Sequence, residues 1–242
     1  MKTITFIAIT LLSGAISGTL LAIMNLGIVE PYIEEAINIE NQNAIAQGEV
    51  INPQEFNDYR LWQKSGEIAA GTILGISLGA LFGVVFALTR NSIPGSNDKK
   101  KALILAAVML LVIYIVPALK YPANPPAVGD PETIYYRESL YITLLTVSGF
   151  SALGLAFLYR KLGDKKGKQI VVVPVIYIGI IAAAFMILPP NPDEITVPMD
   201  LVMGFRIASG LTMSAFWGLL GLILGALWDK TRPHETARIA TV

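Results

Sequence analysis

The sequence contains no cysteine and a single histidine, His234. Without cysteine the chain of 242 residues forms no disulfide and offers no thiolate to a metal ion. The imidazole group, a common catalytic base and metal ligand, is confined to the C-terminal tail. The sequence also lacks a phosphate-binding loop, the zinc-protease helix motif and the Gly-x-Ser-x-Gly turn. We therefore expect a protein that is not an enzyme and that holds no permanently bound cofactor.

Charged residues are scarce as well. They make up 15% of the chain, against about 25% in typical soluble domains, whereas 54% of the residues are hydrophobic. The hydrophobic residues form six uncharged stretches, and a helix needs about 20 such residues to cross the hydrocarbon core of a bilayer. The stretches are residues 4–29, 68–88, 102–119, 140–159, 170–188 and 207–228. Because backbone polar groups cannot stay unpaired in lipid, each stretch is predicted to be a helix.

The six stretches predict an all-α fold. We expect a polytopic integral membrane protein with about six transmembrane helices, which together form one transmembrane domain over residues 1–242. The first stretch follows Lys2 and has some likeness to a secretory signal peptide. Its 26 apolar residues, 4–29, exceed the 7–15 residues of a signal core, so we expect it to remain as a helix.

The basic residues are divided unevenly between the two sides of such a protein. If the helices alternate in direction from an inner N-terminus, the inner segments carry 13 of the 18 Lys and Arg but 4 of the 18 Asp and Glu. Lys and Arg beside membrane helices favour the cytoplasmic side. The sequence therefore predicts a multi-pass protein of the cell membrane with both termini in the cytoplasm. Its short basic clusters suit anionic lipid and predict no nucleic-acid binding, and its acidic outer face attracts cations.

Three outer segments share one pattern. Each has an Asn-Pro pair, then an arginine near the next helix, and that helix ends in a basic residue. The pairs begin at Asn52, Asn124 and Asn191, and the arginines are Arg60, Arg137 and Arg206. We interpret the pattern as a helical hairpin used three times, over about 1–101, 102–169 and 170–230, before a cytoplasmic tail at 231–242. The alternative is chance, because both features are common in membrane loops.

The second predicted helix carries a glycine at every fourth position. Gly71, Gly75, Gly79 and Gly83 therefore lie on one face, and a face without side chains lets another helix approach closely. We favour tight helix packing within one subunit. The alternative is a smooth face that slides, or one that pairs subunits in a homo-oligomer.

Charged residues flank the outer ends of the predicted helices. Glu30 and Glu34 follow the first helix, and Glu67 precedes the second. Their carboxylate oxygens are candidate contacts for a divalent cation, and the alternative is a solvated acidic segment. Arg137 and Arg206 lie at the outer ends of the fourth and sixth helices. They either belong to an ion pathway, where we expect them to organise its mouth by pairing with carboxylates, or act structurally through ion pairs and contact with headgroups.

The proline-rich segment 117–137 reads PALKYPANPPAVGDPETIYYR and resembles the central loop of the CbtA family of predicted cobalt transporters. The junction Val29-Glu30-Pro31, the glycine-rich second helix and the segment 216–221 (FWGLLG) are similar to that family too. The resemblance spans essentially the whole chain.

The resemblance implies a membrane component for cobalt uptake. It implies Co²⁺ as the transported ion, the lipid bilayer as the surroundings and a small His-bearing membrane subunit as a partner. Nothing in the chain is similar to a nucleotide-binding domain, so energy would come from the membrane potential or from a partner. The chain has no obvious His or Cys site of its own for Co²⁺, which leaves a second function open: a non-transporting structural membrane subunit of a larger complex.

Overall fold

The computed structural model describes residues 2–161 and 166–234, and all regular secondary structure in those ranges is helical. The long helices are α1 (Thr3–Ile28), α3 (Pro53–Thr89), α6 (Ile134–Lys161) and α8 (Met199–Thr231). α4 (Asp98–Met109), the π-helical η1 (Leu110–Ile115) and α5 (Val116–Lys120) run on from one another as a further long helix. The shorter elements are α2 (Glu30–Ala46), α7 (Lys166–Ile187) and the 3₁₀ turn η2 (Pro131–Thr133).

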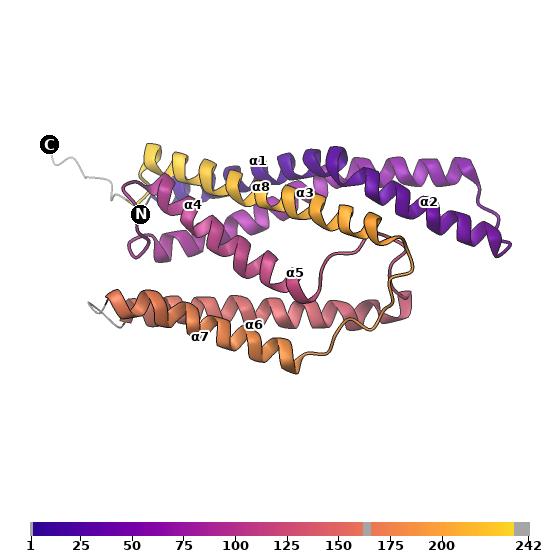
Figure 1. The fold of residues 1–242 in the computed structure, drawn as a ribbon. Coiled ribbons are helices and arrows are strands. Elements are labelled where there is room, and N and C mark those ends of the chain that lie inside the picture. Colours follow the sequence, from indigo (N-terminus) through magenta and orange to yellow (C-terminus); the bar gives the residue numbers. More distant parts are fainter. Residues whose placement is uncertain (1, 162–165, 235–242) are drawn as a thin grey trace.

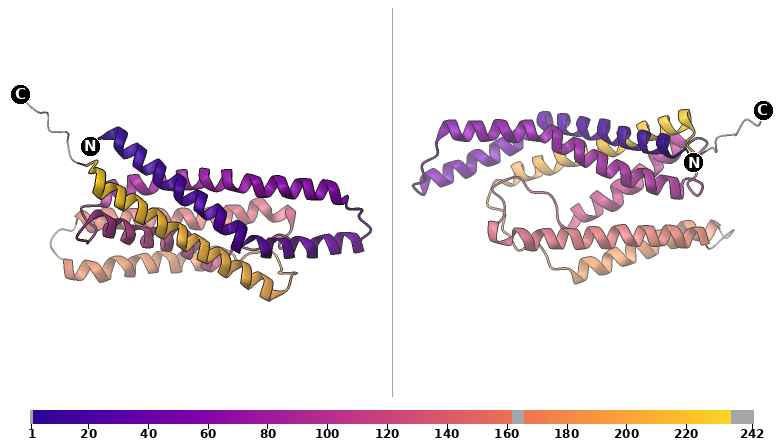
Figure 2. Two further views of the ribbon diagram at one scale, coloured as in Figure 1. Left: turned by 90° about the horizontal axis from the view of Figure 1, so that it is seen from above. Right: turned by 180° about the vertical axis from the view of Figure 1, so that it is seen from behind.

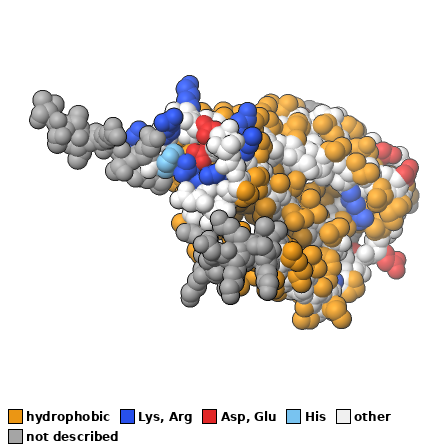
Figure 3. Space-filling model, turned by 60° about the vertical axis from the view of Figure 1, so that its left-hand side comes forward, with side chains coloured by type: hydrophobic (Ala, Val, Ile, Leu, Met, Phe, Trp, Pro, Cys, Tyr) orange, Lys and Arg blue, Asp and Glu red, His pale blue; other side chains and the backbone are white. Residues whose placement is uncertain are grey.

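The described helices are suited to a bilayer. α1, α3, the continuous α4–η1–α5, α6 and α8 are long and apolar enough to cross it, and α7 contains the shorter apolar helix Val171–Ile187. Each of the six predicted stretches falls mainly within one of these helices. Hydrophobic side chains cover the flank of the molecule in Figure 3, as contact with lipid requires. The prediction of an all-α polytopic membrane protein is therefore confirmed.

The spanning helices run alternately up and down, so that the two described chain ends lie at the same end of the bundle (Figures 1 and 2). We call this the terminal end, and the opposite end the loop end. A backbone hydrogen bond of 2.7 Å, from the N–H of Lys2 to the carbonyl of Pro233, joins the chain ends. Of the predicted tail 231–242, residues 235–242 lie outside the described part of the chain.

The helices form a main bundle and a second layer. α1 packs along α3 and against α8, and α4 packs against α8. α6 and α7 pack on each other and meet the main bundle chiefly through η1 and α5 (Figure 1). The most extensive packing joins α1 with α3 inside the first hairpin defined from sequence, whereas α4 with α8 and α6 with α7 pack across the boundary between the second and third hairpins. The threefold hairpin repeat itself stays a prediction.

The contact between α1 and α3 depends on glycine. A methyl group on Gly75 would stand 2.5 Å from the Cα of Gly18, and one on Gly79 would stand 2.7 Å from the Cα of Gly14. Side chains larger than hydrogen would therefore force the two backbones apart. The remaining members of the predicted glycine face also meet α1, with Gly71 against Ala22 and Gly83 against Thr10. The glycine face of α3 is thus a packing face within one subunit.

Large aromatic side chains fill the core on the terminal side of this contact. Phe86 of α3 and Trp228 of α8 meet edge to face, with 4.9 Å between their ring centroids. Phe82 of α3 lies 6.3 Å from Trp217 of α8 by the same measure. All four rings are almost completely buried. Buried aromatic pairs add roughly 0.5–1.5 kcal/mol each beyond the burial of their area, so this cluster holds α3 and α8 together.

A π-helical turn connects the main bundle to the second layer. In η1 the backbone hydrogen bonds reach one residue further than in an α-helix, which leaves carbonyl groups open to other donors. The hydroxyl of Ser148 in α6 donates to the carbonyl of Val112, at 2.5 Å, and lies 2.6 Å from the hydroxyl of Tyr177 in α7. Just beyond, Lys120 donates to the carbonyl of Phe185 at 2.9 Å. These contacts hold α6 and α7 in place.

The segment 30–67, expected to be an outer loop, is largely helical. α3 has 37 residues and is therefore roughly 55 Å long, well beyond the ~30 Å of a hydrocarbon core. Its first turns and α2 extend past the spanning helices at the loop end (Figure 2). Pro31 lies in the first turn of α2, where its missing N–H group has no cost. Asn52 caps α3 by accepting a hydrogen bond of 3.1 Å from the N–H of Gln54.

Replacing Gly75 by alanine should destabilise the fold, because the new methyl group meets backbone atoms of α1. Overpacking of this kind typically costs about 1–3 kcal/mol. Gly149→Ala is the matched control, since no atom lies within 4 Å of a methyl group at that position of α6. We expect Gly75→Ala to lower the melting temperature in detergent by several degrees and Gly149→Ala to maintain or raise it. Equal melting temperatures for the two variants would contradict the close contact of α1 with α3.

Candidate functional site

Charged residues of α2 and α3 meet at the loop end. Glu30, with 7% of its surface exposed, accepts a hydrogen bond from Arg60, and its carboxylate lies 3.4 Å from the ammonium of Lys64. Glu34 accepts a hydrogen bond from Lys64. Residues four apart share one face of a helix, so each helix presents two charges to the other. We call these four residues the ion-pair cluster.

The ion-pair cluster has an enclosed part and an exposed part. The side chains of Glu30 and Arg60 are 9% and 14% exposed, so their pairing is largely shielded from water. The side chain of Glu34 is 50% exposed, so its pair with Lys64 adds about 1 kcal/mol of stability at most. The hydrogen bond from the ammonium of Lys64 nevertheless holds the pKa of Glu34 below its ordinary value.

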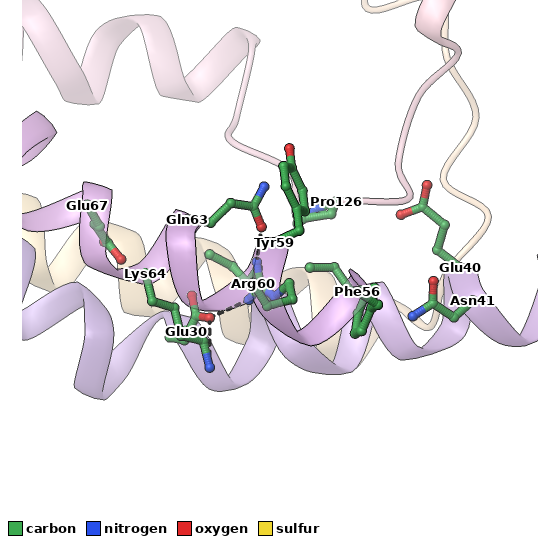
Figure 4. A pocket seen from close by; sticks show the side chains of 12 residues that line it. Glu30, Glu40, Asn41, Phe56, Tyr59, Arg60, Gln63, Lys64, Glu67 and Pro126 are labelled. Carbon is green, nitrogen blue, oxygen red and sulfur yellow. Dashed lines mark hydrogen bonds and ion pairs between the residues drawn. The ribbon is translucent and has the colours of Figure 1, made fainter. Parts of the chain in front are cut away.

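A cavity of about 570 Å³ opens beside the ion-pair cluster (Figure 4). Residues of α2 and α3 form its wall, and Pro126 of the proline-rich loop lies across from them. Three carboxylates line it, against two basic side chains, so its charge favours cations. In Figure 4, Glu67 lies toward one end of the cavity and Glu40 toward the other, with Glu30 and Arg60 between them.

The three carboxylates predicted as cation contacts lie in this region. Glu30 and Glu34 are engaged by basic side chains, and Glu67 interacts with the side chain of Asn25 in α1. Among residues 2–161 and 166–234, no group of three or more His, Cys, Asp or Glu side chains is placed to hold a metal ion. The assignment of these glutamates as contacts for a transported ion stays a prediction. Sequence reasoning overlooked Lys64, although its spacing from Arg60 equals that of Glu34 from Glu30.

Arg137, near the start of α6, joins the segment between α5 and α6 to the segment between α7 and α8. Its Nε lies 2.8 Å from a carboxylate oxygen of Asp193, whose side chain is 6% exposed. The hydroxyl of Thr133 donates to the same carboxylate at 2.9 Å, and the N–H of Asp130 does so at 3.2 Å. A carboxylate partner for Arg137 was expected, but it comes from the other loop and not from the neighbouring Glu138.

Arg206 binds uncharged oxygen atoms of the proline-rich loop. Its Nε donates to the carbonyl of Ala123 at 3.2 Å, and a terminal nitrogen donates to the side-chain oxygen of Asn124 at 2.7 Å. The Asn-Pro pair of this loop is therefore held by the arginine at the start of the spanning part of α8. Both arginines connect loops at the loop end, and the described contacts place neither in the ion-pair cluster.

The sole histidine takes part in a separate cluster at the terminal end. Arg90 binds both carboxylate oxygens of Asp98, at 2.5 and 2.8 Å, and Asp229 accepts from two N–H groups at the start of α4, at 2.9 and 3.1 Å. The indole N–H of Trp228 donates to His234 at 3.1 Å. Basic side chains gather around this histidine in Figure 3. These contacts fasten helix ends to one another.

Asp193→Asn should loosen the outer loops, because the amide keeps the shape of the side chain but removes the charge that Arg137 binds. A hydrogen bond to a charged group contributes about 1.5–3 kcal/mol, so we expect a loss of that order in unfolding free energy. Thermal unfolding of the purified protein measures it. Glu194→Gln, at the exposed next position, is the control and should leave the melting temperature unchanged. Identical melting temperatures for the two variants would show that the ion pair of Arg137 with Asp193 does not stabilise the fold.

Comparison with known proteins bears on this arrangement. Residues 3–229 match the family model described as "Probable cobalt transporter subunit (CbtA)", which confirms the resemblance seen in the sequence. No curated protein and no solved structure gave a match. The matched range begins at the first residue of α1 and ends in the last turns of α8, so it includes every described spanning helix and the loop-end cavity. The chain therefore belongs to the CbtA family of probable cobalt transporter subunits.

Proposed function

We propose that this protein is the membrane subunit through which Co²⁺ is taken up, and that the ion enters at the loop end. The family match supports transport of cobalt by a complex that contains this subunit. The observation that carries the entry site is the cavity of about 570 Å³ with Glu30, Glu40 and Glu67 in its wall. Oxygen ligands bind such a cation weakly, which suits a path that must release what it binds.

The ion-pair cluster explains how the carboxylates at this entrance can be stable while no cation is bound. Arg60 and Lys64 neutralise Glu30 and Glu34 when no cation is present, so the enclosed carboxylate is not left unpaired. Co²⁺ carries the same charge as the two basic side chains together. It can therefore take their place at the carboxylates, and the displaced Arg60 and Lys64 must then turn to water or to counter-ions at the loop end. Glu67, which no basic side chain contacts directly in the described structure, completes the proposed set of ion contacts.

The orientation and the partners follow from the same proposal. The basic residues gathered at the terminal end support the proposal that both termini lie in the cytoplasm, with the entrance outside. A transporter subunit works with other subunits. We propose that one of them is a small membrane protein that supplies the imidazole ligands this chain keeps out of its cavity, and that the complex contains more than one copy of this chain.

A second candidate function has one observation in its favour. Glu30 and Glu34 are already paired, and the described residues hold no preformed group of three metal ligands. A non-transporting structural subunit of a larger complex would need none. In that case the ion-pair cluster would serve only to join α2 to α3.

Labelling of single cysteines tests the orientation, and the chain has no native cysteine to interfere. Asn43→Cys and Glu194→Cys place exposed thiols at the loop end, and Ser96→Cys places one at the terminal end. A maleimide that cannot cross membranes should label the first two in intact cells and the third only after lysis. Labelling of Ser96→Cys in intact cells would reverse the orientation.

Uptake of radioactive Co²⁺ tests the entrance. At matched membrane levels and with the partner subunit present, we expect Glu30→Gln and Glu67→Gln each to raise the half-saturating cobalt concentration about tenfold, equivalent to ~1.4 kcal/mol of binding free energy. Glu34→Gln should have a smaller effect because its carboxylate is half exposed. Glu55→Gln is the control, since it lies on α3 and outside the cavity lining.

Two outcomes would count against the proposal at different levels. Wild-type concentration dependence in Glu30→Gln, Glu34→Gln and Glu67→Gln would reject the entrance while leaving transport intact. A wild-type protein that moves no cobalt, even with its partner present, would favour the structural subunit.

A further inference from the structure

The hydroxyl groups of the spanning helices fall into two classes. Many donate to the carbonyl four residues earlier, which satisfies them within their own helix. Examples are Ser13 to Ile9 at 2.6 Å, Ser77 to Ile73 at 2.9 Å, Thr143 to Ser139 at 2.7 Å and Ser214 to Gly210 at 2.7 Å. Thr10 and Ser17 of α1 are different. They are 3% and 0% exposed, and their hydroxyl oxygens have no hydrogen-bond partner in the described protein.

A third unpartnered group lies on α8. The indole nitrogen of Trp217 is buried and donates to no described atom. Antiparallel packing of α1 and α8 brings Trp217 to about the level of Ser17. The contacts that fix this register are those of Phe6 with Trp228 and of Tyr32 with Gly204. An indole N–H can only donate and a hydroxyl can also accept, so one water molecule would satisfy both groups.

The line of polar groups continues to the proposed entrance. Asn25, about two turns beyond Ser17, interacts with Glu67, and the oxygen of its amide has no described partner. The members on α1 are Thr10, Ser13, Ser17 and Asn25, which lie toward one side of the helix. They span roughly 22 Å at 1.5 Å per residue, most of the ~30 Å hydrocarbon core. Leu21, which is 3% exposed, separates Ser17 from Asn25.

Unpaired polar groups are costly at this depth. Each buried donor or acceptor left unsatisfied has lost its hydrogen bonds to water, and lipid offers no substitute partner. Polar groups retained inside a membrane protein usually face a watery cavity or a transport path. Packing alone does not explain them here, because the neighbouring Ser13 shows that a hydroxyl of α1 can bond to its own helix.

We propose that the place where α1, α3 and α8 meet is a water-accessible seam, lined by Thr10, Ser13, Ser17 and Trp217, that leads the cation from Glu67 toward the terminal end. Its hydroxyl oxygens hold the cation through the water it carries, and Leu21 narrows the seam between Asn25 and Ser17. The inference rests on the proposed function for what passes through the seam. Whether water reaches the seam can be tested without a transport assay.

Thiol accessibility provides that test. Ser17→Cys is nearly isosteric and should fold, and it should react with a small cationic methanethiosulfonate in membranes at least tenfold faster than Ala22→Cys. Ala22 is the matched control because it lies on the same helix, is 1% exposed and packs on the glycine face. Ile16→Cys, on the exposed flank of α1, controls for thiols that face lipid and should also react slowly. Added Co²⁺ should slow the modification of Ser17→Cys.

Uptake supplies the second readout. Ser17→Ala should reduce cobalt uptake at saturation about tenfold at an unchanged melting temperature, whereas a purely structural hydroxyl would leave uptake unaltered. If the wild type transports cobalt but Ser17→Cys reacts no faster than Ala22→Cys, the seam is overturned and the proposed function stands. If the wild type transports nothing, the proposed function fails, and fast modification of Ser17→Cys still supports a water-accessible seam.

Discussion

The approach of α1 to α3, backbone against backbone, is the constraint on which the other features depend. Glycine removes the side chains that would separate the helices, and the gain is dispersion contact along most of the spanning length. α2 follows directly on α1, and the first turns of α3 belong to the same helix as its glycine face. The contact of α1 with α3 therefore also aligns α2 with these first turns, which extend past the membrane. Glu30 meets Arg60 for that reason. The buried polar side of α1 likewise has its position fixed by the glycines beside it.

Much of the fold could be predicted because lipid leaves few alternatives. An apolar stretch of sufficient length must be a helix, and a glycine at every fourth position must form one face. The extent of α3 could not be predicted, since hydropathy marks where lipid begins and not where a helix starts. The binding partners of the two arginines could not be predicted from the sequence either. Arg137 binds Asp193 and Arg206 binds Asn124, and both partners lie far away in the sequence.

The candidate site shows what a sequence pattern conveys about charge. Three glutamates near a membrane surface indicate a cation site, and the structure gathers them in one region. It also adds Arg60 and Lys64, which turn an open acidic surface into a balanced cluster. Such a cluster trades affinity for stability of the empty protein, because an arriving ion must compete with cations that the chain carries itself. Under the proposed function, low affinity of this kind would suit passage of the ion and not its storage.

The π-helical turn at Leu110–Ile115 has a consequence for how this architecture can vary. It accommodates one residue more than the α-helical path would, and one residue corresponds to roughly 100° of rotation about the helix axis. Lys120 and Tyr121 reach Phe185 and Pro189 only in the register that this extra residue sets. A single-residue deletion there would restore an ordinary helix yet turn those anchors away from α7. The attachment of α6 and α7 to the main bundle therefore depends on the number of residues in η1, and a substitution does not change that number.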